Sequence, residues 1–239
     1  MIRIYIITII CLLATLSLQA QELTLEYNVG FATYKMGDMK SLLDEAKPSL
    51  NHVKTTDNFP GYITHQAKLG LEWRKLHQAG LLLDFMNTVG NKGVSDYSAS
   101  YNFTIRTKGV RLGGFYRFAL PDFSECIVRP YLQFSTGVVF NNGTVEEEVT
   151  LAERPKEIID SESLDGTNFF IEPAVGAKIR IHKKLALNIN VGYEFDLTKR
   201  FRNKGQSLTI APDWSGLRLQ GGIIYYIPLT SKRLASCLL

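Results

Sequence analysis

The sequence predicts an all-β fold, an eight-stranded antiparallel up-and-down β-barrel that crosses a membrane. Three observations predict it: an export signal at the N-terminus, eight segments of alternating apolar and polar residues, and connections that are alternately long and short. Successive side chains of a strand point to opposite faces, so each segment would have one apolar and one polar face.

The first 20 residues have the layout of a secretory signal peptide. Arg3 supplies a positive charge, Ile4 to Leu16 is almost wholly apolar, and Ala20 is a small residue at the cleavage position. The apolar run is shorter than the roughly 20 residues of a spanning helix, which makes a transmembrane anchor the weaker alternative. The predicted organisation is signal peptide 1–20 and barrel domain 21–239, with a periplasmic tail at 229–239.

Eight alternating segments follow the signal. They cover 22–34, 63–73, 81–89, 109–118, 128–140, 171–181, 185–197 and 217–227. Most are longer than the ~5–6 residues of an ordinary soluble strand. They reach the ~9–11 residues that a strand needs to cross a bilayer. An even number of strands also returns both ends of the barrel to one side of the membrane.

The connections alternate in length. Long ones are predicted at 35–60, 90–100, 141–168 and 199–213, and short ones at 75–78, 119–125 and 182–184. Outer-membrane barrels have short periplasmic turns and longer extracellular loops, and this order has the correct phase for a periplasmic N-terminus. In the first long connection, residues 36–50 predict a short helix that ends at Pro48.

We assign the apolar face to lipid and the polar face to the lumen. The polar face is rich in glycine, which suits the narrow interior of an eight-stranded barrel. Its charges are of both signs, and unpaired charges there would cost several kcal/mol each, so we expect a filled lumen with an ion-pair network. Aromatic residues near strand ends, among them Trp73 and Trp214, are expected in interface girdles. The predicted lumen network is Glu26, Asp84, Arg111, Arg117, Arg129, Glu172, Lys178, Arg180, Glu194, Asp196 and Arg218.

Four short motifs carry a resemblance. They are Leu18-Gln19-Ala20-Gln21, Arg129-Pro130-Tyr131-Leu132, the run from Glu172 to Lys178, and Asn190-Val191-Gly192-Tyr193. With the repeated strand-and-glycine pattern, the mature chain resembles the outer-membrane β-barrel domain proteins (porin family) of the Bacteroidota, and more broadly the small OmpA- and OmpW-type barrels. The resemblance implies an outer-membrane location and folding by the barrel assembly machinery. One departure is that residues 228–239 continue past the last strand, where such barrels often end on an aromatic residue.

No catalytic, cofactor or metal site is expected. The four histidines are His52, His65, His77 and His182, and no His-x-Ser pair occurs, which resemblance to lipid A deacylases would require. The acidic connection 141–168 has no calcium-loop spacing, and we interpret it as a solvated loop. The formal net charge of +4 is too small to predict a nucleic-acid partner.

Two further sets of residues carry hypotheses. Lys199, Arg200, Arg202 and Lys204 make the last long connection basic, and we expect them to contact lipopolysaccharide phosphates or the acidic connection. Cys126 and Cys237 both map to the periplasmic side and could form a disulfide.

The functional prediction is an integral outer-membrane barrel, not an enzyme, with a structural or surface-interaction role. Its partners would be outer-membrane lipid and lipopolysaccharide. One alternative is porin-like passive transport of small solutes, and the second is a soluble periplasmic lipid-binding barrel. The oligomeric state is left open.

Overall fold

The computed structural model describes residues 22–45, 54–95, 97, 99–123, 126–151, 157–198, 201–203, 206–208 and 211–229. The predicted signal peptide, nearly all of the predicted tail and Cys237 lie outside these residues. The domain organisation therefore stays a prediction.

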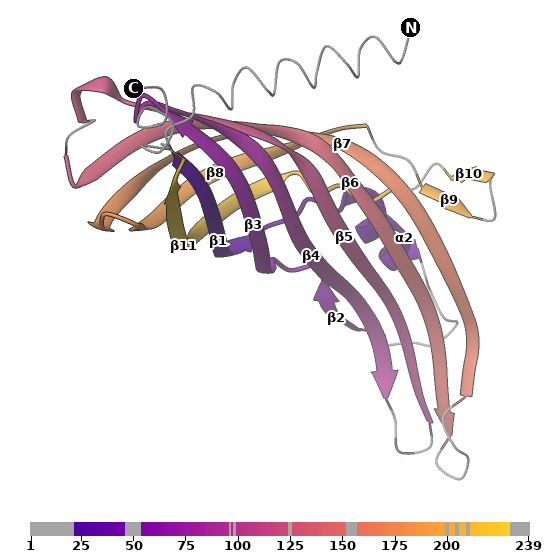
Figure 1. The fold of residues 1–239 in the computed structure, drawn as a ribbon. Coiled ribbons are helices and arrows are strands. Elements are labelled where there is room, and N and C mark those ends of the chain that lie inside the picture. Colours follow the sequence, from indigo (N-terminus) through magenta and orange to yellow (C-terminus); the bar gives the residue numbers. More distant parts are fainter. Residues whose placement is uncertain are drawn as a thin grey trace, which may run out of the picture.

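Eight long strands form a closed ring (Figure 1). Each pairs antiparallel with its neighbour along the chain, and β1 pairs with β11 to close the barrel. This confirms the predicted up-and-down barrel. The ring strands are β1 (Glu22–Ala32), β3 (Tyr62–Trp73), β4 (His77–Ser95), β5 (Ala99–Ala119), β6 (Val128–Leu151), β7 (Glu157–His182), β8 (Leu185–Thr198) and β11 (Gly216–Pro228).

The remaining elements are short and attach to the ring. β2 (Lys54–Asn58) pairs with β4, and the hairpin of β9 (Phe201–Asn203) and β10 (Gln206–Leu208) pairs with β7. η1 (Pro121–Phe123) lies between β5 and β6. α2 (Gly37–Glu45) falls within the helix predicted at 36–50, whose predicted stop at Pro48 is outside the described residues.

No helix among the described residues is long and apolar enough to span a bilayer.

The two ends of the barrel differ. At one, which we call the turn end, β1 begins, β11 ends, and the connections at 74–76, 120–127 and 183–184 are short. At the other, the extended end, β4 to β7 continue well past the other strands as a curved wall (Figure 1). In this wall β4 pairs with β5 as far as Ser95 and Ser100, and β6 pairs with β7 as far as Val149 and Glu157.

This wall corrects two predictions. The connections expected as loops at 90–100 and 141–168 are mostly the arms of long β-hairpins. The clear apolar alternation stops near Phe140, so the pattern no longer indicated a strand. Polar residues nevertheless continue the ladder here, because each arm is paired with a neighbouring strand, and strand propensity depends strongly on such context.

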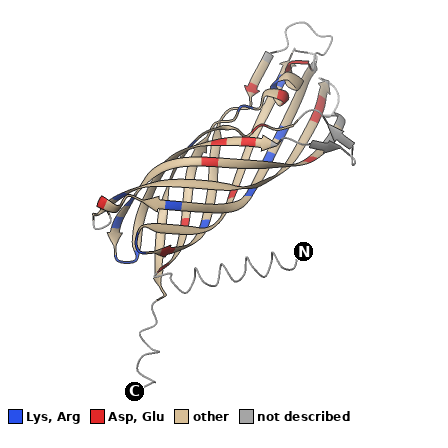
Figure 2. Ribbon diagram, turned by 90° about the horizontal axis from the view of Figure 1, so that it is seen from above, with Lys and Arg blue, Asp and Glu red and all other residues tan. Residues whose placement is uncertain are grey.

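Alternation along the ring strands sets inside and outside. In β8 the odd-numbered Leu187, Ile189 and Val191 are exposed on the outer surface, while Asn188 and Asn190 are buried. Charged residues recur along the strands of the whole barrel (Figure 2). Those on the inward positions of the ring are almost all buried, so the barrel has an apolar outside and a polar inside.

Candidate functional site: the filled lumen

The middle of the lumen holds an ion cluster of two guanidinium groups and three carboxylates from five strands. Arg111 donates to Asp84 (2.7 Å) and to Glu172 (2.5 Å), and lies 3.4 Å from Glu194. Arg218 donates to Glu194 (2.5 Å) and to Asp84 (3.2 Å). All five side chains are at most 1% exposed. Because each arginine bridges several acids, removing one cation would leave carboxylates buried without compensation.

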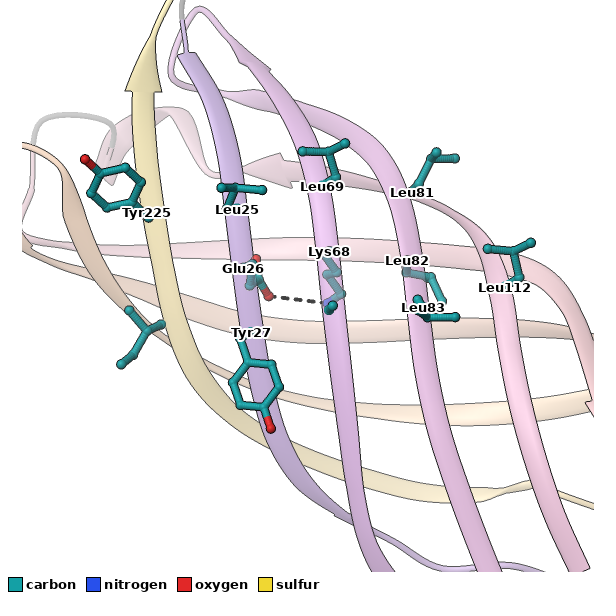
Figure 3. A pocket seen from close by; sticks show the side chains of 12 residues that line it. Leu25, Glu26, Tyr27, Lys68, Leu69, Leu81, Leu82, Leu83, Leu112 and Tyr225 are labelled. Atoms are coloured by element: carbon teal, nitrogen blue, oxygen red, sulfur yellow. Dashed lines mark ion pairs between the residues drawn. The ribbon is translucent and has the colours of Figure 1, made fainter.

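A second cluster lies nearer the turn end and is centred on Glu26. Arg117 donates to Glu26 at 3.0 Å, and Lys68 is 3.5 Å from the same carboxylate (Figure 3). Arg117 also donates to Gln133 and Gln78, and its guanidinium lies 4.2 Å from the centre of the Tyr131 ring. A guanidinium group has more N–H donors than one carboxylate can accept. The two glutamine side chains accept further hydrogen bonds from Arg117, and the Tyr131 ring lies against its guanidinium, so this buried cation is well satisfied.

Separate pairs occupy the lumen at the turn end itself. Lys178 donates to Glu72 at 2.6 Å, with both side chains buried. Arg180 donates to Glu22 at 3.1 Å, and this pair is partly exposed. Arg129 donates to the backbone oxygen of Cys126. The lumen is therefore lined with charge from its middle to this mouth.

The structure thus brings most of the predicted lumen residues into direct contact with an opposite charge. Arg129 contacts a backbone carbonyl instead, and Asp196 is only partly buried near the extended end. Asp196 accepts hydrogen bonds from Asn168 and from the backbone N–H of Trp214. The predicted network left out other buried inward residues that take part in these contacts: Lys68 and Glu72 of β3, Gln78 of β4 and Gln133 of β6.

Toward the extended end the inward side chains become apolar and form a plug. Met39 and Leu43 of α2 are fully buried against the wall formed by β4 and β5. Trp214 is also fully buried; its indole donates to Asn141 at 2.6 Å, and Tyr34 meets its ring edge-on at 4.8 Å. The other buried members are Ala32, Met36, Phe59, Met86, Phe103, Ile105, Val139, Leu164 and Phe170; the same apolar cluster continues between the two charge clusters through Leu82 and Phe115.

The plug corrects the expectation that Trp214 lies in an interface girdle. Its segment, residues 211–215, folds into the barrel mouth, and Asp196 fixes the Trp214 backbone there. Lys92 fixes α2 in a similar way, because its ammonium donates to the Leu43 and Asp44 carbonyl oxygens at the C-terminus of the helix. A cation at this position compensates the partial negative charge of the helix end.

Beyond the plug, the wall carries titratable groups. Partial burial and a hydrogen bond with Glu147 raise the pKa of Tyr101 to about 12. Tyr101 therefore keeps its phenolic proton at any physiological pH.

The basic connection and the cysteines are only partly described. Lys199, Arg200 and Lys204 lie outside the described residues; Arg202 is in β9, and its backbone pairs with that of Asp165 in the predicted acidic connection. Cys126 is exposed at the turn end and has no disulfide partner among the described residues. Its pairing with Cys237 stays a prediction, as do the lipopolysaccharide contacts.

Among the described residues, no group of three or more His, Cys, Asp or Glu side chains could hold a metal ion.

Comparisons with known proteins gave only structural matches. No protein-family model matches the sequence. No curated protein matches it either. Among solved structures, the outer membrane protein OprG from Pseudomonas aeruginosa is similar with a TM-score of 0.49 and 12% identity, over 88% of this chain and 97% of that one.

Two other solved structures show a weaker similarity. A major outer membrane protein from Thermus thermophilus has a TM-score of 0.44 and 11% identity, over 87% of this chain and 100% of its own. Ail, the attachment invasion locus protein of Yersinia pestis, has a TM-score of 0.37 and 11% identity, over 87% and 99% of the two chains. All these values are low, and the closed ring of strand pairing is what defines the fold here.

Proposed function

We propose that this chain is an integral outer-membrane barrel with a sealed lumen, and that it acts through its surface rather than as a pore or an enzyme. The observation that carries the proposal is a belt of exposed apolar side chains around a charged interior. Within the belt Leu81 is 63% exposed, Ile63 60% and Leu197 59%. A soluble monomer rarely exposes a contiguous apolar surface of this extent, whereas a bilayer requires it.

The belt has a sharp upper border on the four wall strands. The cross-strand row Phe85, Val110, Phe140 and Thr167 is apolar on β4, β5 and β6, and on β7 the last outward apolar residue is Phe169, one outward position earlier. Two positions further toward the extended end, the outward row is Asn87, Lys108, Asn142 and Asp165, and all four are exposed. A change from apolar to polar within one outward position fits the edge of a hydrocarbon layer.

The same border argues against a soluble periplasmic lipid-binding barrel. Such a barrel would need an apolar cavity inside, but the lumen beneath the belt is filled by the ion cluster and the Glu26 cluster. Burying these charges is favourable only because they satisfy one another, and acyl chains could not replace that.

Passive transport is the second candidate, and the interior works against it too. A solute would have to pass the plug and then two layers of tightly paired charge. Eight strands enclose a space that side chains alone can fill. We therefore place the function at the extended end, which would stand above the membrane and present a polar outer face that includes Arg106, Lys108 and Glu146. Contact with lipopolysaccharide or with other proteins would occur there.

The sequence resemblance to Bacteroidota barrel domains supports the same location, and the Bacteroidota origin remains a prediction. Assembly by the barrel assembly machinery follows from the same proposal.

Two measurements test the proposal together. In cell fractionation, we expect the protein to stay with outer membranes after alkaline carbonate washing and to require detergent for release. In planar bilayers, we expect the refolded protein to insert without stable single-channel conductance. Release by osmotic shock would contradict the membrane assignment, and reproducible conductance steps would favour passive transport over the sealed barrel.

A further inference from the structure

The lipid-facing belt carries two adjoining apolar grooves over β1, β3, β4 and β5, the first reaching β11 and the second reaching β6. One has a volume of about 470 Å³ and is lined by residues such as Leu25, Leu83 and Leu112 (Figure 3). The other, of about 500 Å³, runs toward the turn end past Ala79 and Gly114 to Trp73. Leu69 and Leu81 line both, so the two grooves adjoin each other on the barrel surface.

Small residues form the floor of the lower groove. Ala79 faces outward on β4, and Gly114 lies beside it on β5, directly opposite Leu81 in the strand pairing. A Cβ added at Gly114 would meet only the backbone oxygen of Gly80, at 3.6 Å. The groove therefore exists because side chains here are small or missing, and a side chain could start at Gly114 without a close contact at its Cβ.

An aromatic cluster stands at the turn-end mouth of this groove. The rings of Trp73 and His77 are stacked at 5.7 Å, and His77 shares a 2.7 Å hydrogen bond with the Tyr116 hydroxyl. Tryptophan and tyrosine rings prefer the headgroup level of a membrane. The mouth therefore lies where a phospholipid changes from acyl chain to polar headgroup.

Two cationic residues come directly after Trp73, in the turn that joins β3 to β4. Arg74 and Lys75 are the central residues of the tight turn closed by the bond from the Leu76 N–H to the Trp73 oxygen. Both are exposed, with φ of 53° and 56°. A turn with positive φ at both central residues normally takes Asn-Gly or Asp-Gly there, because larger residues are strained at positive φ. Two long cationic side chains where the backbone favours glycine point to a role for their charge.

We propose that this groove binds one anionic phospholipid from the leaflet at the turn end. An acyl chain would lie in the groove between Leu69, Leu81 and Tyr116, and the phosphate would meet Arg74 and Lys75. The inference rests on the proposed membrane location. A second copy of the chain is a poorer occupant, because two copies meeting at this face would bring their cationic turns together.

Fluorescence of Trp73 can test this, because the chain has only two tryptophans and the other, Trp214, is buried in the plug. The protein is refolded into phosphatidylcholine vesicles that contain a minor fraction of phosphatidylglycerol. In one set the phosphatidylglycerol has brominated acyl chains; in the matched set the same fraction of phosphatidylcholine is brominated. We expect several-fold stronger quenching by the brominated anionic lipid. A Trp73→Phe variant should lose the quenchable signal.

Variants separate the headgroup from the acyl chain. Arg74→Gln with Lys75→Gln should abolish the preference for the anionic lipid, because near-surface cations attract anionic headgroups. Gly114→Leu should fill the groove and reduce quenching by both lipids. The matched control is Gly221→Leu. Gly221 is an outward glycine on β11, where a Cβ would meet only the Asn188 oxygen at 3.8 Å. This variant should leave quenching by each of the two brominated lipids unchanged.

Three results would overturn the proposal. One is equal quenching by the two brominated lipids, and another is an equal effect of Gly114→Leu and Gly221→Leu. The third is a dimer in analytical ultracentrifugation whose Trp73 is shielded from both lipids, since a second copy would then occupy the groove. Vesicle flotation separates these results from failure of the membrane proposal, because a protein that does not float with vesicles has not inserted at all.

Discussion

The interior of this barrel changes along the same strands from a mainly charged half, at the turn end, to a mainly apolar half, at the extended end. On β5, Arg111 and Arg117 face the lumen while Leu112 and Tyr116 face outward. Further toward the extended end of the same strand, Phe103 and Ile105 face inward and are buried, while Arg106 and Lys108 face outward. The inward positions keep the same parity throughout, so only the chemistry of the two faces is exchanged.

The exchange follows the solvent outside. Where the outer face meets hydrocarbon, apolar burial gives no net gain, and the interior can be polar as long as its charges are paired. Where the outer face meets water, the hydrophobic effect operates as in a soluble protein and collects Met39, Leu43 and Trp214 into the plug. The reversal on β5 thus marks where the strand leaves the membrane.

Removing a cation from the lumen should have the largest effect on stability and tests whether the interior depends on paired charges. Arg111→Met keeps most of the side-chain volume, but the buried carboxylates of Asp84 and Glu172 lose the cation that pairs with them. We expect a loss of about 3–5 kcal/mol in the free energy of unfolding. Urea unfolding of the barrel in lipid vesicles, followed by circular dichroism, measures it.

The matched control is an arginine on the same strand and on the opposite face. Arg106 pairs with Glu146 at 3.8 Å, with both side chains substantially exposed. Arg106→Met should cost at most about 1 kcal/mol. Equal losses for Arg111→Met and Arg106→Met would mean that the interior is not the low-dielectric network described above.

A charge placed in the belt tests the outer face. Ile189 is 51% exposed on β8 and pairs with Gly221 of β11. Ile189→Arg should destabilise the barrel by about 2–4 kcal/mol if this position lies near the bilayer centre. Ser163→Arg on the exposed outer face of the wall should stay within about 0.5 kcal/mol. If the urea unfolding curves of the two variants in vesicles coincide, both the belt at Ile189 and the wall at Ser163 face water.

The plug should respond as a soluble core does. Leu43→Ala removes buried methyl groups from α2, and we expect a loss of about 2–3 kcal/mol, at the low end for such cavities because the barrel mouth can relax. The loss should be local, with faster hydrogen exchange in α2 and unchanged protection in β8. The control is Leu42→Ala in the same helix, which should cost less stability because Leu42 is only partly buried. Global unfolding at a lower urea concentration with no local exchange would contradict a separate plug.

The barrel could be predicted because its signal is local. A period of two over segments such as 185–197 fixes which residues share a face, and the length of the segments favours a membrane. The lumen residues followed from the same parity, which also contained Lys68 and Glu72, although the predicted network did not include them. Which charge meets which could not be predicted, since Arg111 contacts residues from β4, β7 and β8.

The plug could not be predicted for a different reason. Its members come from α2, from the segment at Trp214 and from inward positions of the wall, and no single stretch of sequence carries the pattern. The apolar residues Phe103 and Ile105 also have the inward parity that the rule for the belt reserves for polar groups. At the extended end apolar residues face inward, as in a soluble protein, whereas in the belt they face outward. The alternation along a strand does not show where the first arrangement gives way to the second.

The smallest expected effect concerns how the plug is held. Lys92 donates to the Leu43 and Asp44 carbonyl oxygens at 3.2 and 3.1 Å, so it binds the end of α2 to the wall. Lys92→Met should lower the stability of α2 by about 0.5–1 kcal/mol, because the helix end loses its compensating cation. Hydrogen exchange of the α2 amides measures this, and Lys92→Arg should restore most of the protection. Lys108→Met, on the outer face of β5, should leave α2 unchanged; if it loosens α2 as much, then the contact of Lys92 with the helix end does not hold the plug.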